Sequence, residues 1–143
     1  LERLLAGTPH APRLVFYRGS AERRAVLARY LGQPGAVLVA PALERGLDLP
    51  DADCRVIVVC KAPYPDLGDA QVRARTALPG GWAWYRMRTL RSLVQMTGRG
   101  VRHTEDFCVS YTLDRQVNKL IAQHRQDLPG WWLEALRSPW ADW

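Results

Sequence analysis

Arginine and glutamine side chains recur at helical spacing between residues 88 and 102. In a helix of about 100° per residue, one face would carry Arg88, Arg91, Gln95, Arg99 and Arg102. The opposite face would carry Leu90, Leu93, Val94, Thr97 and Val101. Guanidinium groups bind phosphate oxygens through a planar fork, so the arginine row could gather on a phosphate. A solvated amphipathic helix would give the same spacing, which leaves both interpretations open.

Gly98 and Gly100 interrupt this row. Each glycine costs a helix about 1 kcal/mol relative to alanine. We therefore expect the helix to end near these residues. The glycines could also let the backbone approach a ligand closely.

Two motifs that nucleoside triphosphate hydrolysis usually requires are absent from the sequence. A phosphate-binding loop needs a lysine followed by Ser or Thr, but Lys61 precedes Ala62 and Lys119 precedes Leu120. No Asp-Glu dipeptide occurs, so the acidic pair that usually holds magnesium and activates water is missing as well. We predict that this chain alone does not hydrolyse ATP.

The composition suits one globular domain with its own core, since the chain has 143 residues and 48% of them are hydrophobic. A net charge of +6 and a pI of about 9.7 favour a polyanionic partner, although an arginine-rich sequence can equally reflect genome base composition. No apolar run approaches the roughly 20 residues of a membrane helix, and we expect no membrane contact. Cys54, Cys60 and Cys108 lack metal-ligand spacing, so we expect buried thiols, no metal site and a cytoplasmic, reducing compartment. Because residue 1 is Leu, we expect the chain to be a piece of a longer protein.

Strand-like and helix-like patterns alternate along the chain. Apolar, β-prone runs lie at residues 13–17, 35–40, 55–60 and 107–112. Helical patterns occupy residues 1–6, 20–32 with Ser20 as N-cap, 69–78, a longer stretch from Trp82, 114–124 with Asp114 as N-cap, and 129–137. The runs 35–40 and 55–60 are continuously apolar, which predicts parallel strands covered on both faces. The alternation predicts an α/β, doubly wound, mostly parallel sheet flanked by helices, in a single domain over residues 1–143.

Four segments resemble motifs of superfamily-two helicases, in the order found in that family. Residues 95–102 (QMTGRGVR) resemble motif VI, QxxGRxxR, and residues 42–48 (ALERGLD) resemble motif V. Residues 61–69 (KAPYPDLGD) resemble the K-x-P-[FY]-P loop of the DinG/XPD branch, and residues 107–116 (FCVSYTLDRQ) resemble its closing strand and Asp-Arg turn. The likeness extends from Arg13 to about Arg137, and it implies the second, C-terminal RecA-like lobe of such a helicase.

The resemblance implies roles for individual residues at a shared ATP site. Arg102 is the expected arginine finger, Arg99 a second contact to the γ-phosphate, and Gln95 a hydrogen-bond partner of the phosphate or the attacking water. Asp48 would contact the ribose or link nucleotide to DNA, unless it merely caps the turn before Leu49-Pro50. The remaining residues implied at the site are Gly46 and Gly98, at which the backbone could approach the nucleotide, and Arg45, which could reach nucleotide or nucleic acid.

The resemblance also implies partners. ATP and Mg would be held mainly by an N-terminal RecA-like lobe. That lobe, and the first strand of the present lobe, are expected to precede this chain. Single-stranded DNA is the expected track, which suits a helicase in DNA repair. In some relatives an iron–sulfur cluster is bound by the N-terminal half of the helicase, so no cluster is expected in this chain. The alternative is a catalytically dead RecA-like module that binds nucleic acid or a protein partner.

Several aromatic side chains have weaker functional claims. Trp131 and Trp132 start an apolar-spaced helix, which favours packing in the core or docking onto the other lobe over base stacking. Trp82, Trp84 and Tyr85 are expected to pack under the loop that precedes them. His103 is interpreted as a surface or capping side chain, because no nucleophile pattern accompanies it.

Overall fold

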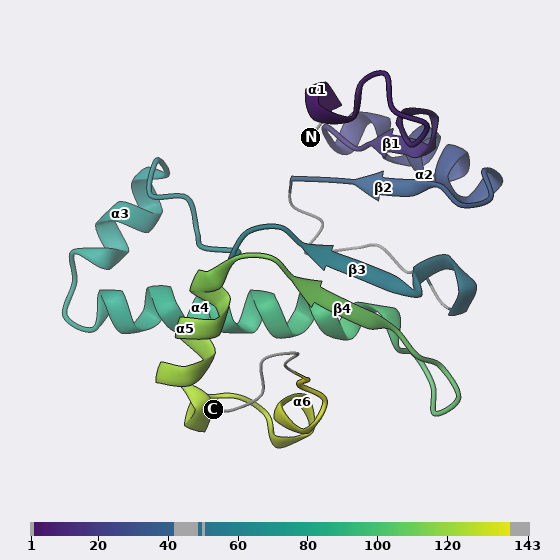
Figure 1. Cartoon of the computed structure of the whole chain (residues 1–143). Coiled ribbons are helices and arrows are strands. Elements are labelled where there is room, and N and C mark those ends of the chain that lie inside the picture. Colours follow the sequence, from purple (N-terminus) through teal and green to yellow (C-terminus); the bar gives the residue numbers. More distant parts are fainter. Residues whose placement is uncertain (1, 42–48, 50, 138–143) are drawn as a thin grey trace. The chain divides into compact units, whose positions relative to one another are not determined.

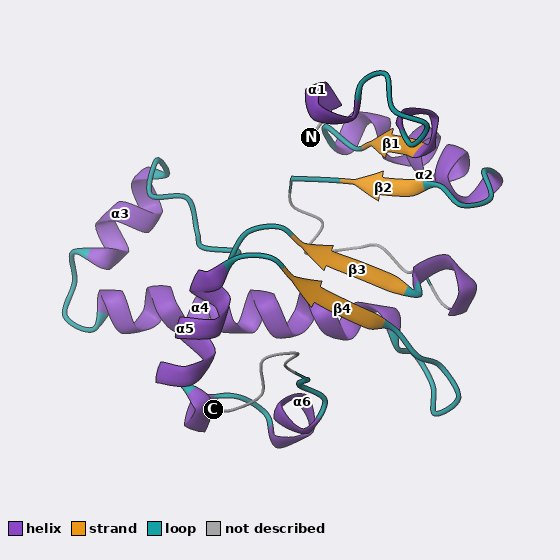
Figure 2. Cartoon of the chain, viewed as in Figure 1, coloured by secondary structure: helices purple, strands orange, loops and turns teal. Residues whose placement is uncertain are grey.

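The computed structural model describes residues 2–41, 49 and 51–137 (Figure 1). The contacts within the chain divide it into two compact units, Leu1–Leu47 and Asp48–Trp143. Within the described part of each unit, two strands pair in parallel, with helices between them in the sequence (Figure 2). No helix among these residues combines the length and the hydrophobicity needed to cross a bilayer.

The first unit is a small strand-helix-strand arrangement. Its elements in chain order are α1 (Glu2–Leu5), a 3-10 turn (Ala11–Arg13), β1 (Leu14–Phe16), a 3-10 turn (Ser20–Glu22), α2 (Arg23–Gly32) and β2 (Val37–Val39). Strands β1 and β2 pair in parallel from Leu14↔Val37 to Phe16↔Val39. The expected N-cap at Ser20 is wrong, because the chain first makes the 3-10 turn and the N-cap position of α2 is Glu22.

The second unit holds most of the segments in which chemistry was predicted, including motif VI. Its elements in chain order are a 3-10 turn (Asp51–Cys54), β3 (Val56–Val59), α3 (Ala70–Thr76), α4 (Gly81–Thr97), a 3-10 turn (Gly98–Gly100), β4 (Val109–Thr112), α5 (Arg115–Gln123), a 3-10 turn (Arg125–Asp127) and α6 (Gly130–Glu134). Strands β3 and β4 pair in parallel from Val56↔Val109 to Val59↔Thr112. The helices predicted over residues 69–78, from Trp82, 114–124 and 129–137 are therefore confirmed in type.

Local sequence explains where two of these helices begin. The Asp69 carboxylate accepts the backbone N–H groups of Gln71 and Val72 at the start of α3. Asp114 accepts the N–H of Gln116 at the start of α5. A carboxylate in this position satisfies backbone donors that the first helical turn leaves without partners. Asp114 was predicted as a cap from the sequence, and the structure confirms it.

The core of the second unit lies between the β3–β4 pair and helices α4, α5 and α6. Its buried members are Val59, Leu90, Leu93, Val117, Leu120, Leu128 and Trp132. Figure 1 shows α4 extending along this pair of strands, and Leu90 and Leu93 on α4 are almost fully buried, as the apolar face predicted. Because α4 is anchored through these side chains, its C-terminal end is a fixed starting point for the residues that follow.

The prediction that strands 35–40 and 55–60 are covered on both faces is wrong for this structure. Val56 is 59% exposed and Val58 50%, whereas Val59 is buried. Alternate residues of a strand point to opposite faces, so one face of β3 packs on the helices and the other stays open. In the first unit Val37 is 44% exposed. An α/β organisation with parallel strands is confirmed, while the full doubly wound sheet and the single domain stay predictions.

Candidate functional site

The end of α4 places the arginine-containing segment. Helix α4 ends at Thr97, and Gly98 donates its N–H to the carbonyl of Val94. The Thr97 hydroxyl donates to the carbonyl of Leu93 over 3.0 Å. It also accepts the indole N–H of Trp132 over 2.8 Å, which ties the helix end to α6. The predicted packing role of Trp132 is therefore confirmed.

The predicted row of side chains on a single helical face is correct only as far as Gln95. Arg91 and Gln95 lie exposed on α4, but Arg99 lies in the 3-10 turn and Arg102 follows the extended residue Val101. Val101, expected on the apolar face, is 46% exposed. The helix ends at the glycines, as predicted, so a projection of the helix cannot be extended beyond Thr97.

Gly98 and Gly100 differ in what surrounds them. A Cβ at Gly98 would meet only the ring of Trp131, at an ordinary distance of 3.7 Å. A Cβ at Gly100 would come within 2.4 Å of Cys108 Cβ and 2.8 Å of the Cys54 carbonyl oxygen. Gly100 is buried against Cys108, just before β4, and Cys54, at the end of the 3-10 turn before β3, so only glycine fits there. This requirement of the fold was not recognised in the sequence.

Asp106 organises the loop that follows Arg102. Its side chain is fully buried, although residues 101–105 are exposed. One carboxylate oxygen accepts the Arg102 N–H over 3.0 Å and the other binds the Arg55 guanidinium. Burial raises the pKa of Asp106. The bonds from Arg55 and from the N–H groups of Arg102, Asp51 and Phe107 outweigh this and hold the pKa below its usual range.

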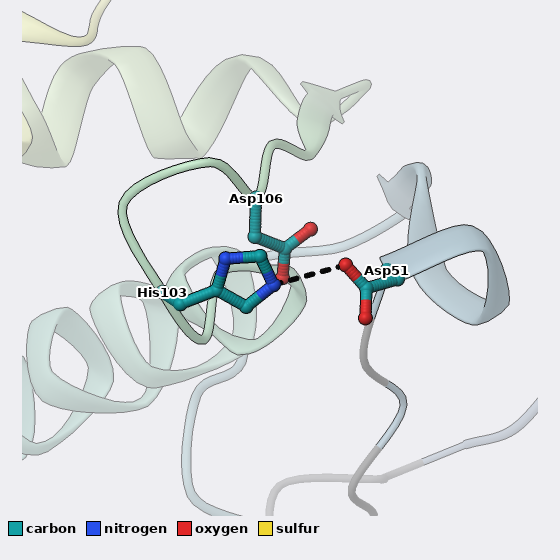
Figure 3. A group of neighbouring side chains, drawn as sticks. All are labelled: Asp51, His103 and Asp106. Carbon is teal, nitrogen blue, oxygen red and sulfur yellow. Dashed lines mark hydrogen bonds and ion pairs between the residues drawn. The ribbon is translucent and has the colours of Figure 1, made fainter.

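Asp51, His103 and Asp106 form a compact group of possible metal ligands (Figure 3). His103 Nε2 lies 3.0 Å from Asp51 Oδ1, and the two side chains are half-exposed. Arg55 already supplies a positive charge beside both carboxylates, with its guanidinium bound to Asp106 and 3.8 Å from Asp51. Because Asp106 is saturated by hydrogen-bond donors, the group is better suited to hold the loop than to hold a cation.

The charges of Arg99 and Arg102 act on the same thiol. Burial raises the pKa of Cys54, while a hydrogen bond with Cys108 and the charges of Arg99 and Arg102 act in the opposite direction. Burial likewise raises the pKa of Cys108 to about 11. The two arginines thus lie within electrostatic reach of Cys54. All three cysteines are free thiols, but Cys60 is exposed, so the prediction of a buried thiol is wrong there.

The K-A-P-Y-P loop and the Asp-Arg turn meet in the structure. Asp114, at the N-terminus of α5, accepts the backbone N–H of Ala62 over 2.9 Å. Tyr64 stacks on Tyr85 with ring centroids 5.5 Å apart, and the Tyr85 hydroxyl donates to the carbonyl of Pro65. Tyr85 packs under the loop as predicted. Trp82 lies edge-on to Tyr85 but is 54% exposed.

Three of the predicted site residues, Arg45, Gly46 and Asp48, lie outside the described residues. Trp131 is 60% exposed, so it does not pack in the core, and its docking onto the other lobe stays a prediction. The sequence alone did not predict Asp106, Arg55 or Asp51 as site residues. No local pattern marks Asp106, because a carboxylate in a polar loop is usually solvated and its partner Arg55 lies 51 residues away.

Comparisons with known proteins agree with the motifs. The helicase C-terminal domain family matches residues 2–135 of this chain. Regulator of telomere elongation helicase 1 of Homo sapiens is 28% identical over 70% of this chain and 9% of its own length. The Fanconi anemia group J protein homolog of Gallus gallus is 32% identical over 51% of this chain and 7% of its own length. The regulator of telomere elongation helicase 1 homolog of Anopheles gambiae is 27% identical over 80% of this chain and 13% of its own length.

The chain therefore spans only a small part of these relatives, between 7 and 13% of the proteins compared above. The family match, in contrast, covers nearly all of the chain, including the segments that resemble motifs V and VI. The chain belongs to the helicase C-terminal domain family, which agrees with the resemblance of its motifs to superfamily-two helicases.

Proposed function

We propose that this chain is the C-terminal lobe of an ATP-dependent DNA helicase and that it supplies the arginine finger for ATP hydrolysis. The observation that supports this most directly is the motif VI segment itself. Gln95, Arg99 and Arg102 follow one another out of the end of a helix that the core holds rigidly. Groups that stabilise charge in a transition state must be held in place before the reaction, and an anchored helix end provides such a support.

The active site would be divided between two lobes. An N-terminal lobe would hold ATP and Mg, because the present sequence has neither a phosphate-binding loop nor an acidic pair. Arg102 would then neutralise charge that develops on the transferring γ-phosphoryl group, with Arg99 as a second contact. Arginine fingers accelerate phosphoryl transfer by about 10³ to 10⁵. Gln95 would hydrogen-bond the phosphate or the attacking water.

Single-stranded DNA is the proposed track. The chain carries a net charge of +6, and phosphate neutralisation by arginine is the main source of sequence-independent binding. Two of the relatives are named for telomere elongation and Fanconi anemia. By analogy we assign the whole protein to DNA maintenance or repair, with Arg45, Gly46 and Asp48 of motif V and Gly98 on the nucleotide or DNA side of the lobe.

The test is the rate of phosphate release by the full-length protein with single-stranded DNA and magnesium. Arg102→Lys keeps the charge but loses the planar fork, so turnover should fall by about 10²-fold or more. Arg91→Ala removes an exposed arginine two turns before the 3-10 turn and is the matched control, with an expected loss of less than about 3-fold. Equal losses in the two variants would refute the finger assignment.

The isolated chain provides a second measurement. It should release no phosphate from ATP above the background rate, because the residues that bind magnesium and phosphates are missing. A turnover of about 1 per second, ordinary for an enzyme, would overturn the divided site. A full-length protein that binds DNA without hydrolysing ATP would favour the catalytically dead module instead.

A further inference from the structure

Asp106 connects the motif VI segment to the region that follows motif V. It is buried beneath an exposed loop, where an uncompensated carboxylate would be strongly destabilising. The bond to the Arg102 N–H fixes the backbone from which that side chain projects. The bond to Arg55 fixes the carboxylate at the beginning of β3.

Arg55 is itself held independently of Asp106. Its guanidinium donates to the carbonyl of Phe107 over 2.9 Å and lies 4.4 Å from the centroid of the Phe107 ring. The side chain of Arg55 is 33% exposed, so it can remain charged and hydrated when Asp106 is changed. This makes a substitution at Asp106 less damaging to the fold than loss of a fully enclosed ion pair.

Asp51 shows that the connection maintains an unusual backbone. It lies three residues after Asp48 in the sequence and has a φ of 52°, in the left-handed region that residues other than glycine rarely adopt. Its N–H is among the groups that stabilise the Asp106 carboxylate, and its side chain bonds to His103. Aspartate adopts this region more readily than most side chains, and these bonds hold Asp51 in it.

We propose that Asp106 is a positioning residue for the motif VI arginine finger: its carboxylate holds the Arg102 backbone and Asp51, just after motif V, in one fixed arrangement. This inference rests on the proposed role of Arg102. Asp106 itself does not touch the nucleotide. When it is altered, the Arg102 side chain remains present but is no longer held where charge develops, so turnover falls more than ATP affinity.

The variant is Asp106→Asn in the full-length helicase, which keeps the size of the side chain and an oxygen for the Arg102 N–H but removes the charge that binds Arg55. With single-stranded DNA and magnesium, kcat for ATP hydrolysis should fall by about 10-fold or more, and KM for ATP should change by less than about 3-fold. His103→Ala is the matched control. It removes the imidazole that binds the Asp51 side chain and leaves the bonds from Arg55 and Arg102 to Asp106 in place. Its kcat should stay within about 2-fold of the parent value.

A double-mutant cycle separates positioning from general damage. If Asp106 acts through the finger, Asp106→Asn should lower kcat by less than about 2-fold when Arg102→Lys is already present. An equal loss in both backgrounds would overturn the proposal and assign Asp106 a purely structural role. The urea midpoint of each variant, measured on the same preparations, shows whether that variant is folded. A second cycle uses Asp106→Ala, which removes both carboxylate oxygens.

The same data distinguish failure of this inference from failure of the proposed function. If Arg102→Lys leaves kcat unchanged, the finger assignment fails, and the positioning inference fails with it. If Arg102→Lys abolishes turnover while Asp106→Asn and Asp106→Ala do not lower it, only the positioning inference is wrong.

Discussion

Gly100→Ala should destabilise the second unit, because the added methyl group has no room. The nearest atoms would be Cys108 Cβ at 2.4 Å, Cys108 Sγ at 2.5 Å and the Cys54 carbonyl oxygen at 2.8 Å. Carbon atoms pack best about 3.5 to 4.0 Å apart, so the turn or β4 must move by about 1 Å. Insertion of a methylene into a packed site costs about 1 to 3 kcal/mol. We expect the upper end of this range, because one of the clashing groups is backbone.

Urea unfolding followed by tryptophan fluorescence measures this cost. All six tryptophans lie after residue 80, so the signal reports the second unit. With a slope of about 2 kcal/mol per molar urea, a loss of about 3 kcal/mol lowers the midpoint by about 1.5 M. A midpoint within about 0.3 M of the parent value would refute the close packing inferred at Gly100.

Gly98→Ala is the matched control for the same measurement. Its added methyl group would meet only Trp131 at 3.7 Å, and Gly98 has a φ of −80°, which alanine adopts readily. Its midpoint should equal or slightly exceed that of the parent. In a double-mutant cycle, Cys108→Gly should recover part of the loss at Gly100 because it removes both clashing side-chain atoms. Additive effects of the two substitutions would contradict the clash.

Three further measurements test other parts of the structure. Trp132→Phe removes the 2.8 Å bond to Thr97 and should cost about 1 to 2 kcal/mol in urea unfolding, whereas Trp131→Phe, at a side chain on the surface, should change stability by less than about 0.5 kcal/mol. The N–H groups of Ala62 and Gln116 hold the pKa of Asp114 below its ordinary value of 3.8, so its carboxylate stabilises the fold fully above that pH; the midpoint difference between parent and Asp114→Ala should be largest at neutral pH and shrink as the pH falls below 3.8. A difference that stays constant with pH would refute this origin. The isolated chain should bind single-stranded DNA weakly, with an affinity that falls steeply between low and physiological salt in fluorescence anisotropy; binding that is independent of salt would point to a dedicated recognition module.

Local patterns predicted most helices and strands, because the formation of these elements depends on residues that are neighbours in the sequence. A few residues of sequence are enough to recognise three of these features: the cap of α5 at Asp114, the glycine pair at the end of α4 and the short apolar strands. The exposure of one face of β3 could not be predicted in this way. A continuous apolar run indicates that a strand could be buried on both faces. In β3, however, Val56 and Val58 stay exposed because only one face of the strand packs on helices of this unit.

The candidate site was predictable as a motif but not as a geometry. The family resemblance identifies Gln95, Arg99 and Arg102. A helical projection places them on one face, but the helix ends at Thr97, so only Gln95 lies on it. What fixes the position of Arg102 is instead a carboxylate in its own loop, which is held by an arginine 51 residues earlier in the chain. Partners so distant in sequence leave no periodic pattern between them.

The spacing of motif VI therefore reflects a change of backbone rather than a helix face. Three residues in a helix would turn the second arginine by about 300° and raise it by about 4.5 Å. Here Arg99 lies in a tight turn and Arg102 follows an extended residue, so the chain between them can redirect the second side chain. Gly100 permits this path by packing directly on Cys108, and Asp106 closes it by binding the Arg102 N–H. An alanine at Gly100 and an asparagine at Asp106 would thus disturb the same segment from opposite ends, one through packing and the other through charge.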